Sequence, residues 1–262
     1  MTKRHAAAAL VLLALAAAVA VVLLRKPARP ASRGRLDGFP KVVLWAWERP
    51  EDLRFLNPRE AGVAFLATTL FLYGDQVSVR PRLQPLQFPE GTALMAVARI
   101  ETDRSVPPAL SAGQIARAVP AITEPARLPG VRALQIDFDA TLSQRPFYRR
   151  LLEELRRALP ESTALSITAL ASWCWGDDWL SGLPIEEAVP MLFRMGPGGH
   201  QVLERLQAGD GFRTALCQGS IGISTDEPAP AVPAGRRVYL FHPQPWSPVA
   251  FQEIRARNAG TF

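Results

Sequence analysis

The sequence is poor in cysteine and histidine, with two and three residues of these types among 262. The two histidines of the main body, His200 and His242, lack the spacing of metal ligands, so no metal site is expected. No G-x-S-x-G nucleophile motif, G-x-G-x-x-G dinucleotide motif or glycine-rich phosphate loop is present either. These absences argue against a zinc enzyme, an α/β-hydrolase and a nucleotide-dependent enzyme, and we expect no cofactor.

One long apolar run is present, over residues 6–24, after the basic residues Lys3 and Arg4. Its length predicts one membrane-spanning helix and exceeds most signal-peptide cores. No A-x-A cleavage site closes the run, so an uncleaved signal anchor over residues 1–26 is favoured over a signal peptide cut near residues 28–32. The basic residues after the run would by themselves favour a cytoplasmic body. A basic start followed at once by an apolar run is, however, the layout of export signals, so we expect an extracytoplasmic body anchored in the inner membrane, or a periplasmic one after cleavage.

The net charge of +6 is concentrated near the N-terminus. Residues 1–38 hold seven of the thirty basic and one of the twenty-four acidic residues, so residues 39–262 carry twenty-three of each. A nucleic-acid-binding domain usually has a basic patch of its own, so we expect no nucleic-acid partner. Residues 27–38, rich in proline and arginine, predict a tether beside the membrane.

Eight short apolar segments recur after residue 39, punctuated by proline and glycine. They lie at residues 41–47, 62–72, 92–100, 132–139, 164–171, 188–195, 220–224 and 236–242. Helical patterns separate several of them, at residues 111–122, 145–160 and 198–209. Alternating strands and helices predict a parallel sheet, and eight units predict a (β/α)8 TIM-type barrel over residues 39–262, with the helices of the first units reduced. A doubly wound open sheet is the alternative.

In this layout the two cysteines, Cys174 and Cys217, follow one strand and precede another. That order would place them at opposite ends of the sheet, beyond bridging distance. One disulfide is possible in an oxidising compartment. We expect instead two free, largely buried thiols.

The working groups of such a barrel project from the C-terminal ends of its strands. In the fourth segment Asp137 and Asp139 share one face with Gln135, and the apolar residues between them share the other. Both aspartates should therefore point toward the barrel mouth. Arg99 and Glu101 end the neighbouring third segment, so Asp137 could equally be the partner of Arg99 in a structural ion pair.

All six tryptophans lie at or just beyond predicted C-terminal strand ends. Flat aromatic faces at a concave mouth suit the C–H faces of sugar rings. Paired carboxylates beside such faces indicate glycoside chemistry, in which one acid protonates the leaving oxygen and another is base or nucleophile. Asp139 and Glu101 are the first catalytic candidates, and Asp137 is expected to act as a partner that raises the pKa of Asp139 or fixes its position. The candidate substrate-binding residues are Trp45, Trp47, Trp173, Arg99, Arg194, Asp226, Glu227 and Trp246.

Several long segments resemble an uncharacterised bacterial family, domain of unknown function 3142. They include "WAWERPEDLRFL", "LQIDFDATLSQRPFY", "LSITALASWC" and "GSIGISTDEP", within residues 40–250. The resemblance implies a barrel related to glycosidases and no settled activity. The fourth segment also resembles in part the chitinase motif D-x-x-D-x-D-x-E, but Leu134 and Thr141 replace its first aspartate and its catalytic glutamate.

The expected function is therefore that of a membrane-tethered, glycosidase-like barrel that acts on or recognises an envelope or exported polysaccharide. The alternative is a non-catalytic barrel of the cell envelope that binds a glycan or a protein through the same mouth. Fold alone does not establish chemistry, so the enzymatic interpretation depends on the carboxylates.

Overall fold

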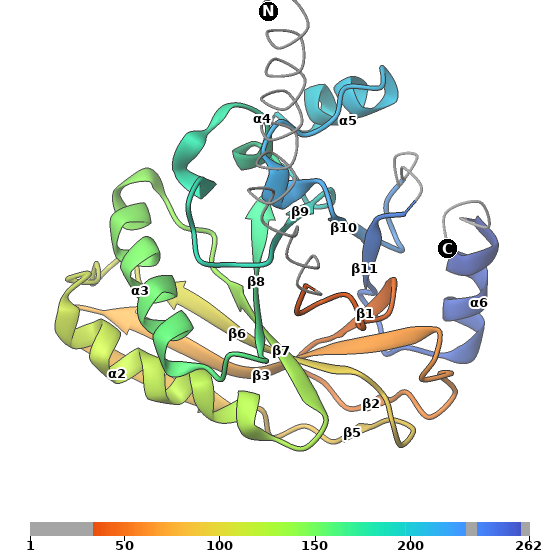
Figure 1. Cartoon of the computed structure of the whole chain (residues 1–262), viewed down its shortest axis with the longest axis horizontal. Coiled ribbons are helices and arrows are strands. Elements are labelled where there is room, and N and C mark those ends of the chain that lie inside the picture. Colours follow the sequence, from red (N-terminus) through yellow and green to blue (C-terminus); the bar gives the residue numbers. More distant parts are fainter. Residues whose placement is uncertain (1–33, 197, 229–234, 258–262) are drawn as a thin grey trace, which may run out of the picture. The chain divides into compact units, whose positions relative to one another are not determined.

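Eight parallel strands close into a barrel in the computed structural model, which describes residues 34–196, 198–228 and 235–257. The strands are β1 (Val42–Ala46), β3 (Ala61–Tyr73), β6 (Leu94–Thr102), β7 (Val131–Asp137), β8 (Ala164–Leu170), β9 (Glu187–Met191), β10 (Ser220–Ser224) and β11 (Arg237–Phe241). Closure follows from β1, which pairs with β3 on one side and β11 on the other. All eight predicted strands and the closed parallel barrel are confirmed (Figure 1).

Five helices lie in the described part of the chain, and all follow the third barrel strand. They are α2 (Ala112–Thr123), α3 (Arg145–Ala158), α4 (Trp173–Gly176), α5 (Gly199–Gln207) and α6 (Pro248–Arg257). The first three barrel strands are connected without helices, by the antiparallel strand β4 (Gln76–Pro81) and by a short pairing of β2 (Glu51–Asp52) with β5 (Leu86–Gln87). The prediction of reduced helices in the first units is therefore confirmed.

The sequence favours the starts of the two longest helices. Ser111 caps α2 through a reciprocal pair of hydrogen bonds with Gln114. A proline in its first turn suits α3, because proline lacks an N–H that would find no helical acceptor there. Single 3₁₀ turns follow or precede the helices and strands, at η1 (Glu124–Arg127), η2 (Leu142–Gln144), η3 (Asp178–Leu180) and η4 (Ala215–Cys217).

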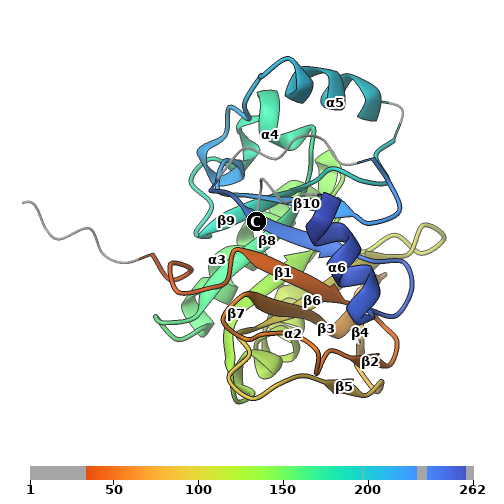
Figure 2. The ribbon, with the colours of Figure 1, turned by 90° about the vertical axis from the view of Figure 1, so that its right-hand side faces the viewer.

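Strand alternation divides the barrel into an outer and an inner apolar layer. Leu134 and Ile136 of β7 belong to the outer layer, with Leu151 of α3. Trp45, Met95 and Tyr239 belong to the inner layer. Figure 2 shows α6 on the outside of the barrel. Its Phe251 packs against Phe55 with 6.0 Å between ring centres. The outer layer fixes which residues of each strand point inward.

The compact unit that contains the barrel starts at Arg35, within the expected tether. Leu36 and Phe39 are buried in the inner layer. Arg237 holds this segment by donating hydrogen bonds to the carbonyl oxygens of Leu36 and Pro40, at 2.8 and 3.1 Å. The last residues of the predicted tether therefore belong with the barrel.

The expected membrane helix over residues 6–24 lies outside the described residues. None of the helices that the structure describes is long and apolar enough to span a membrane.

The expectation of two free thiols is wrong, because Cys174 and Cys217 form a disulfide with their Cα atoms 5.8 Å apart. Both cysteines lie in the outer apolar layer rather than at the strand ends nearest in sequence. The chain before β10 meets the α4 segment there, with Arg213 and Thr214 donating backbone hydrogen bonds to the Cys174 carbonyl. Connections between parallel strands run back along the outside of the sheet, so sequence order does not fix their distance from its ends.

Candidate carbohydrate site at the barrel mouth

β7 carries the first carboxylate of the site into the barrel. Gln135 and Asp137 point inward as the alternation predicts, and Asp137 is 9% exposed. Its Oδ1 accepts a hydrogen bond from the hydroxyl of Thr168 at 2.7 Å, and its Oδ2 lies 3.8 Å from Nη1 of Arg99. Burial raises the pKa of Asp137 above its ordinary value, while the Thr168 hydrogen bond and Arg99 oppose the rise.

The second carboxylate, Asp139, follows the end of β7 and lines the same cavity. Its side chain is exposed toward the mouth. Among the described residues it has no hydrogen-bond or ion-pair partner. Desolvation raises the pKa of Asp139, and the charge of Arg99 opposes this. Two carboxylates whose pKa values are raised by burial therefore share one cavity.

The cavity at the mouth has a volume of about 470 Å³ and aromatic walls. Trp45 and Trp47 of the β1 end face Phe193 and Phe241 from the later strands. Phe193 and Phe241 stack with their planes 5° apart, and Trp45 lies 6.0 Å from Phe193 between ring centres. Flat apolar faces of this kind match the C–H faces of a sugar ring.

Two arginines line the cavity, and acidic residues hold each of them. The guanidinium of Arg99 lies over Trp47 at 5.8 Å and pairs with Glu101 at 2.8 Å. Arg194 lies over Phe241 at 5.6 Å and pairs with Asp226 at 3.0 Å.

Arg194 is further fixed through its backbone, which has a positive φ of 49°. Its N–H donates to the carboxylate of Glu227 at 3.1 Å. A hydrogen bond from Ser224 lowers the pKa of Asp226, which keeps that partner ionised. Glu101, Asp226 and Glu227 therefore orient the two arginines and do not themselves line the cavity.

The expected gathering of the tryptophans at the mouth needs correction. Only Trp45 and Trp47 line the cavity. Trp173 is buried in the outer layer, edge-on to Trp179 at 4.8 Å, and Trp246 is buried there with its indole N–H donating to the Trp45 carbonyl. A residue that follows a strand can turn over the rim of the barrel and pack against its outside. A large apolar side chain such as tryptophan is more stable buried there than exposed at the mouth.

Two aromatic residues of the cavity, Phe193 and Phe241, were missed at the sequence level. Alternation would have identified Phe241, because it shares the inward face of β11 with Arg237 and Tyr239. Thr168 was also missed. Alternation would have identified it, because it shares the inward face of β8 with Ser166. Phe193 follows the end of β9, where strand alternation gives no guidance.

Thr141, at the position of the chitinase glutamate, lies at the start of η2. Thr141 does not line the cavity, and its backbone N–H donates a hydrogen bond to the side chain of Gln144 at 2.8 Å. In the part of the chain that the structure describes, no group of three or more histidine, cysteine or acidic residues is placed to hold a metal.

One comparison with known proteins agrees with the resemblance seen in the sequence. The model of the family DUF3142, a domain of unknown function, matches residues 90–185, a stretch that includes β7 and both aspartates. Among solved structures, the spore cortex-lytic enzyme SleL of Bacillus cereus is similar with a TM-score of 0.45 and 16% identity, over 71% of this chain and 51% of that one. The chain thus spans about half the length of that structure. A comparison with curated proteins found no match.

Proposed function

We propose that this protein is a carbohydrate-active barrel that binds a sugar chain in the mouth cavity and hydrolyses a glycosidic bond there. The observation that carries the proposal is the presence of Asp137 and Asp139, both with a raised pKa, in one aromatic-lined cavity. A carboxylic acid that protonates a leaving oxygen needs such a raised pKa. Trp47, which lines the cavity and is partly exposed, would support a sugar ring.

The environments of the two aspartates suggest different roles. Asp139 is exposed to the cavity and free of partners among the described residues, so it is the candidate acid. Asp137 is buried, and its anion is stabilised by Thr168 and Arg99, so it is the candidate for stabilising positive charge on the sugar. Glu101 would position Arg99, which changes its expected role from catalysis to support.

A second candidate function is carbohydrate binding without hydrolysis. Both aspartates come from the end of one strand, and the acidic residues across the mouth are engaged by Arg194. No unpaired carboxylate from another strand faces Asp139 among the residues lining the cavity. A glycosidase with its two acids on opposite sides of the bond would require one.

The site of action that we propose is the cell envelope, with an envelope or exported polysaccharide as the substrate. Residues 6–24 would anchor the barrel in the inner membrane, or be removed on secretion to the periplasm. The Cys174–Cys217 disulfide supports this location, because structural disulfides persist in oxidising compartments.

The test is a screen of the full chain for binding and hydrolysis on a panel of bacterial polysaccharides, in a detergent without a sugar head group. Asp139→Asn and Asp137→Asn are compared with Asp103→Asn, an exposed aspartate outside the cavity. Hydrolysis that Asp139→Asn abolishes while binding persists would establish the enzyme. Binding without turnover in all four proteins would leave the binding barrel, and binding to no member of the panel would overturn both.

A further inference from the structure

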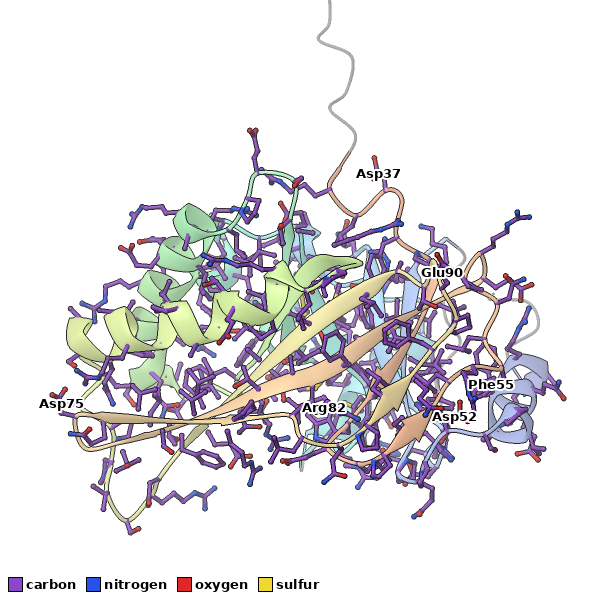
Figure 3. The ribbon with its side chains drawn as sticks, turned by 90° about the horizontal axis from the view of Figure 1, so that it is seen from below. Asp37, Asp52, Phe55, Asp75, Arg82 and Glu90 are labelled. Atoms are coloured by element: carbon purple, nitrogen blue, oxygen red, sulfur yellow. A yellow bond between two sulfur atoms is a disulfide. The ribbon has the colours of Figure 1, made fainter. Side chains whose placement is uncertain are left out.

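Two barrel strands continue past the ring of the barrel on the side of the mouth. The pairing of β6 with β7 ends at Arg99 and Asp137, whereas β3 and β6 remain paired as far as Leu72 and Thr102. β4 adds an antiparallel strand to the outer edge of β3. Figure 3 shows this hairpin reaching from Arg82 to its tip at Asp75, with α2 alongside. We call the projecting part of β3, β4 and β6 the ledge.

The two faces of the ledge differ in what covers them. Leu70, Leu72 and Ile100 point to one face and are buried in the outer layer that α2 shares. On the other face the register pairs Thr69 with Arg99 and Phe71 with Glu101. Since Arg99 also lines the mouth cavity, this second face continues the cavity wall outward.

Aromatic rings recur along this second face. Phe71 is partly exposed, and Tyr73 is 38% exposed. They lie two and four residues beyond Thr69, which places them roughly 7 and 13 Å farther from the cavity along an extended strand. With Trp47 at the mouth, the rings form a row at intervals that a chain of linked sugars could follow.

The charges beside the row are balanced. Arg80 lies over Phe71 at 5.2 Å and pairs with Glu48 at 2.8 Å. Arg99, over Trp47, pairs with Glu101 at the same distance. A surface built to hold a polyanion would carry unpaired cations, whereas here each of these arginines has its own carboxylate.

We infer that the ligand is an uncharged polysaccharide that extends from the mouth cavity across the ledge, with successive sugar rings on Trp47, Phe71 and Tyr73. This inference rests on the proposed function, because the cavity must first hold a sugar. It adds the class of the substrate and the direction in which its chain leaves the site. The affinity should then grow with chain length until the ledge is covered.

The experiment measures binding of uncharged β-linked glucose and N-acetylglucosamine oligomers, from disaccharide to octasaccharide, to the full chain by calorimetry. Oligogalacturonates of the same lengths serve as charged probes. The variants are Phe71→Ala and Tyr73→Ala, and the matched control is Val79→Ala, an exposed residue on the opposite face of the same hairpin. Tyr73 makes no hydrogen bond through its side chain among the described residues, so its removal should leave the fold intact.

We expect each aromatic variant to weaken binding of the longest uncharged oligomer by about fivefold to tenfold and to leave the disaccharide unchanged. Val79→Ala should change neither. Equal affinity for short and long oligomers, or tighter binding of the charged series, would overturn the inference while leaving a sugar site in the cavity. Absence of binding at every length would overturn the proposed function as well.

Discussion

Thr168 donates a hydrogen bond from its hydroxyl to Oδ1 of Asp137 across 2.7 Å, between the ends of β8 and β7. The bond favours the ionised carboxylate, yet burial has the larger effect and raises the pKa of Asp137. The folded protein therefore keeps a carboxylate where the charged form is unfavourable. Such groups are common at functional sites, where stability is given up for chemistry.

Asp137→Asn should stabilise the protein at neutral pH. Because the folded-state pKa is above the ordinary value of 3.8, the stability that Asp137 contributes is fully present below that value and is lost as the pH rises through the folded-state pKa. Asparagine keeps the shape and acceptor without the charge. We expect the free energy of unfolding to rise by on the order of 1 kcal/mol at neutral pH and the difference to vanish in acid, measured by urea unfolding across pH.

Asp103→Asn is the matched control of opposite sign. Hydrogen bonds from Ser105 and Val106 lower the pKa of Asp103, so its contribution is present above the unfolded pKa and is lost as the pH falls through the folded one. Asp103→Asn should lower the free energy of unfolding at neutral pH and should have no effect on it in acid. Two variants that shift stability in the same direction would contradict the environment assigned to Asp137.

Removal of the disulfide should destabilise the barrel strongly. Cys174 and Cys217 are 43 residues apart in sequence, and a closed loop of that length restricts the unfolded chain by about 4 kcal/mol. We expect the double variant to alanine to lose most of that stability in denaturant unfolding. Wild-type protein that is reduced before unfolding should lose the same stability as the double variant. Unfolding midpoints equal to that of the oxidised wild type in both cases would show that the disulfide contributes nothing to stability.

The strands and their faces could be predicted from sequence because strand burial has a period of two that the residues display directly. Asp137 was placed correctly by this rule, as were Gln135 and the outward Ile136. The rule ends with the strand. Trp173 and Cys174 lie only a few residues past β8, yet both pack outside the barrel, because burial in tertiary contacts decides the path of a connection.

Gly222 in β10 faces the interior where no side chain fits. A Cβ atom there would lie 2.6 Å from Cη2 of Trp45, whose indole N–H is held by Gln135 at 2.9 Å. We expect Gly222→Ala to displace this ring, to cost about 1–3 kcal/mol of stability and to change the tryptophan fluorescence. Gly219→Ala, where nothing lies within 4 Å of the added atom, should leave the fluorescence unchanged. The same fluorescence spectrum in both variants would show that the position of the Trp45 ring does not require a glycine at residue 222.

A buried ion pair inside the barrel links β9 to β11 and should be costly to break. Glu187 accepts from Arg237 at 2.9 Å, and both side chains are less than 10% exposed. Glu187→Gln leaves the arginine without a counter-charge, so we expect a loss of about 3–5 kcal/mol in urea unfolding. Glu60→Gln, which breaks an exposed pair with Arg255, should cost about 1 kcal/mol or less.

The same variant should loosen the N-terminal segment that Arg237 holds. Its guanidinium donates to the carbonyl oxygens of Leu36 and Pro40, and these bonds need the arginine in its present position. In Glu187→Gln we expect faster amide hydrogen exchange over residues 36–39 than in Glu60→Gln. Equal exchange in the two variants, together with equal stability, would mean that the interior pair neither supports the barrel nor fixes the chain that enters it.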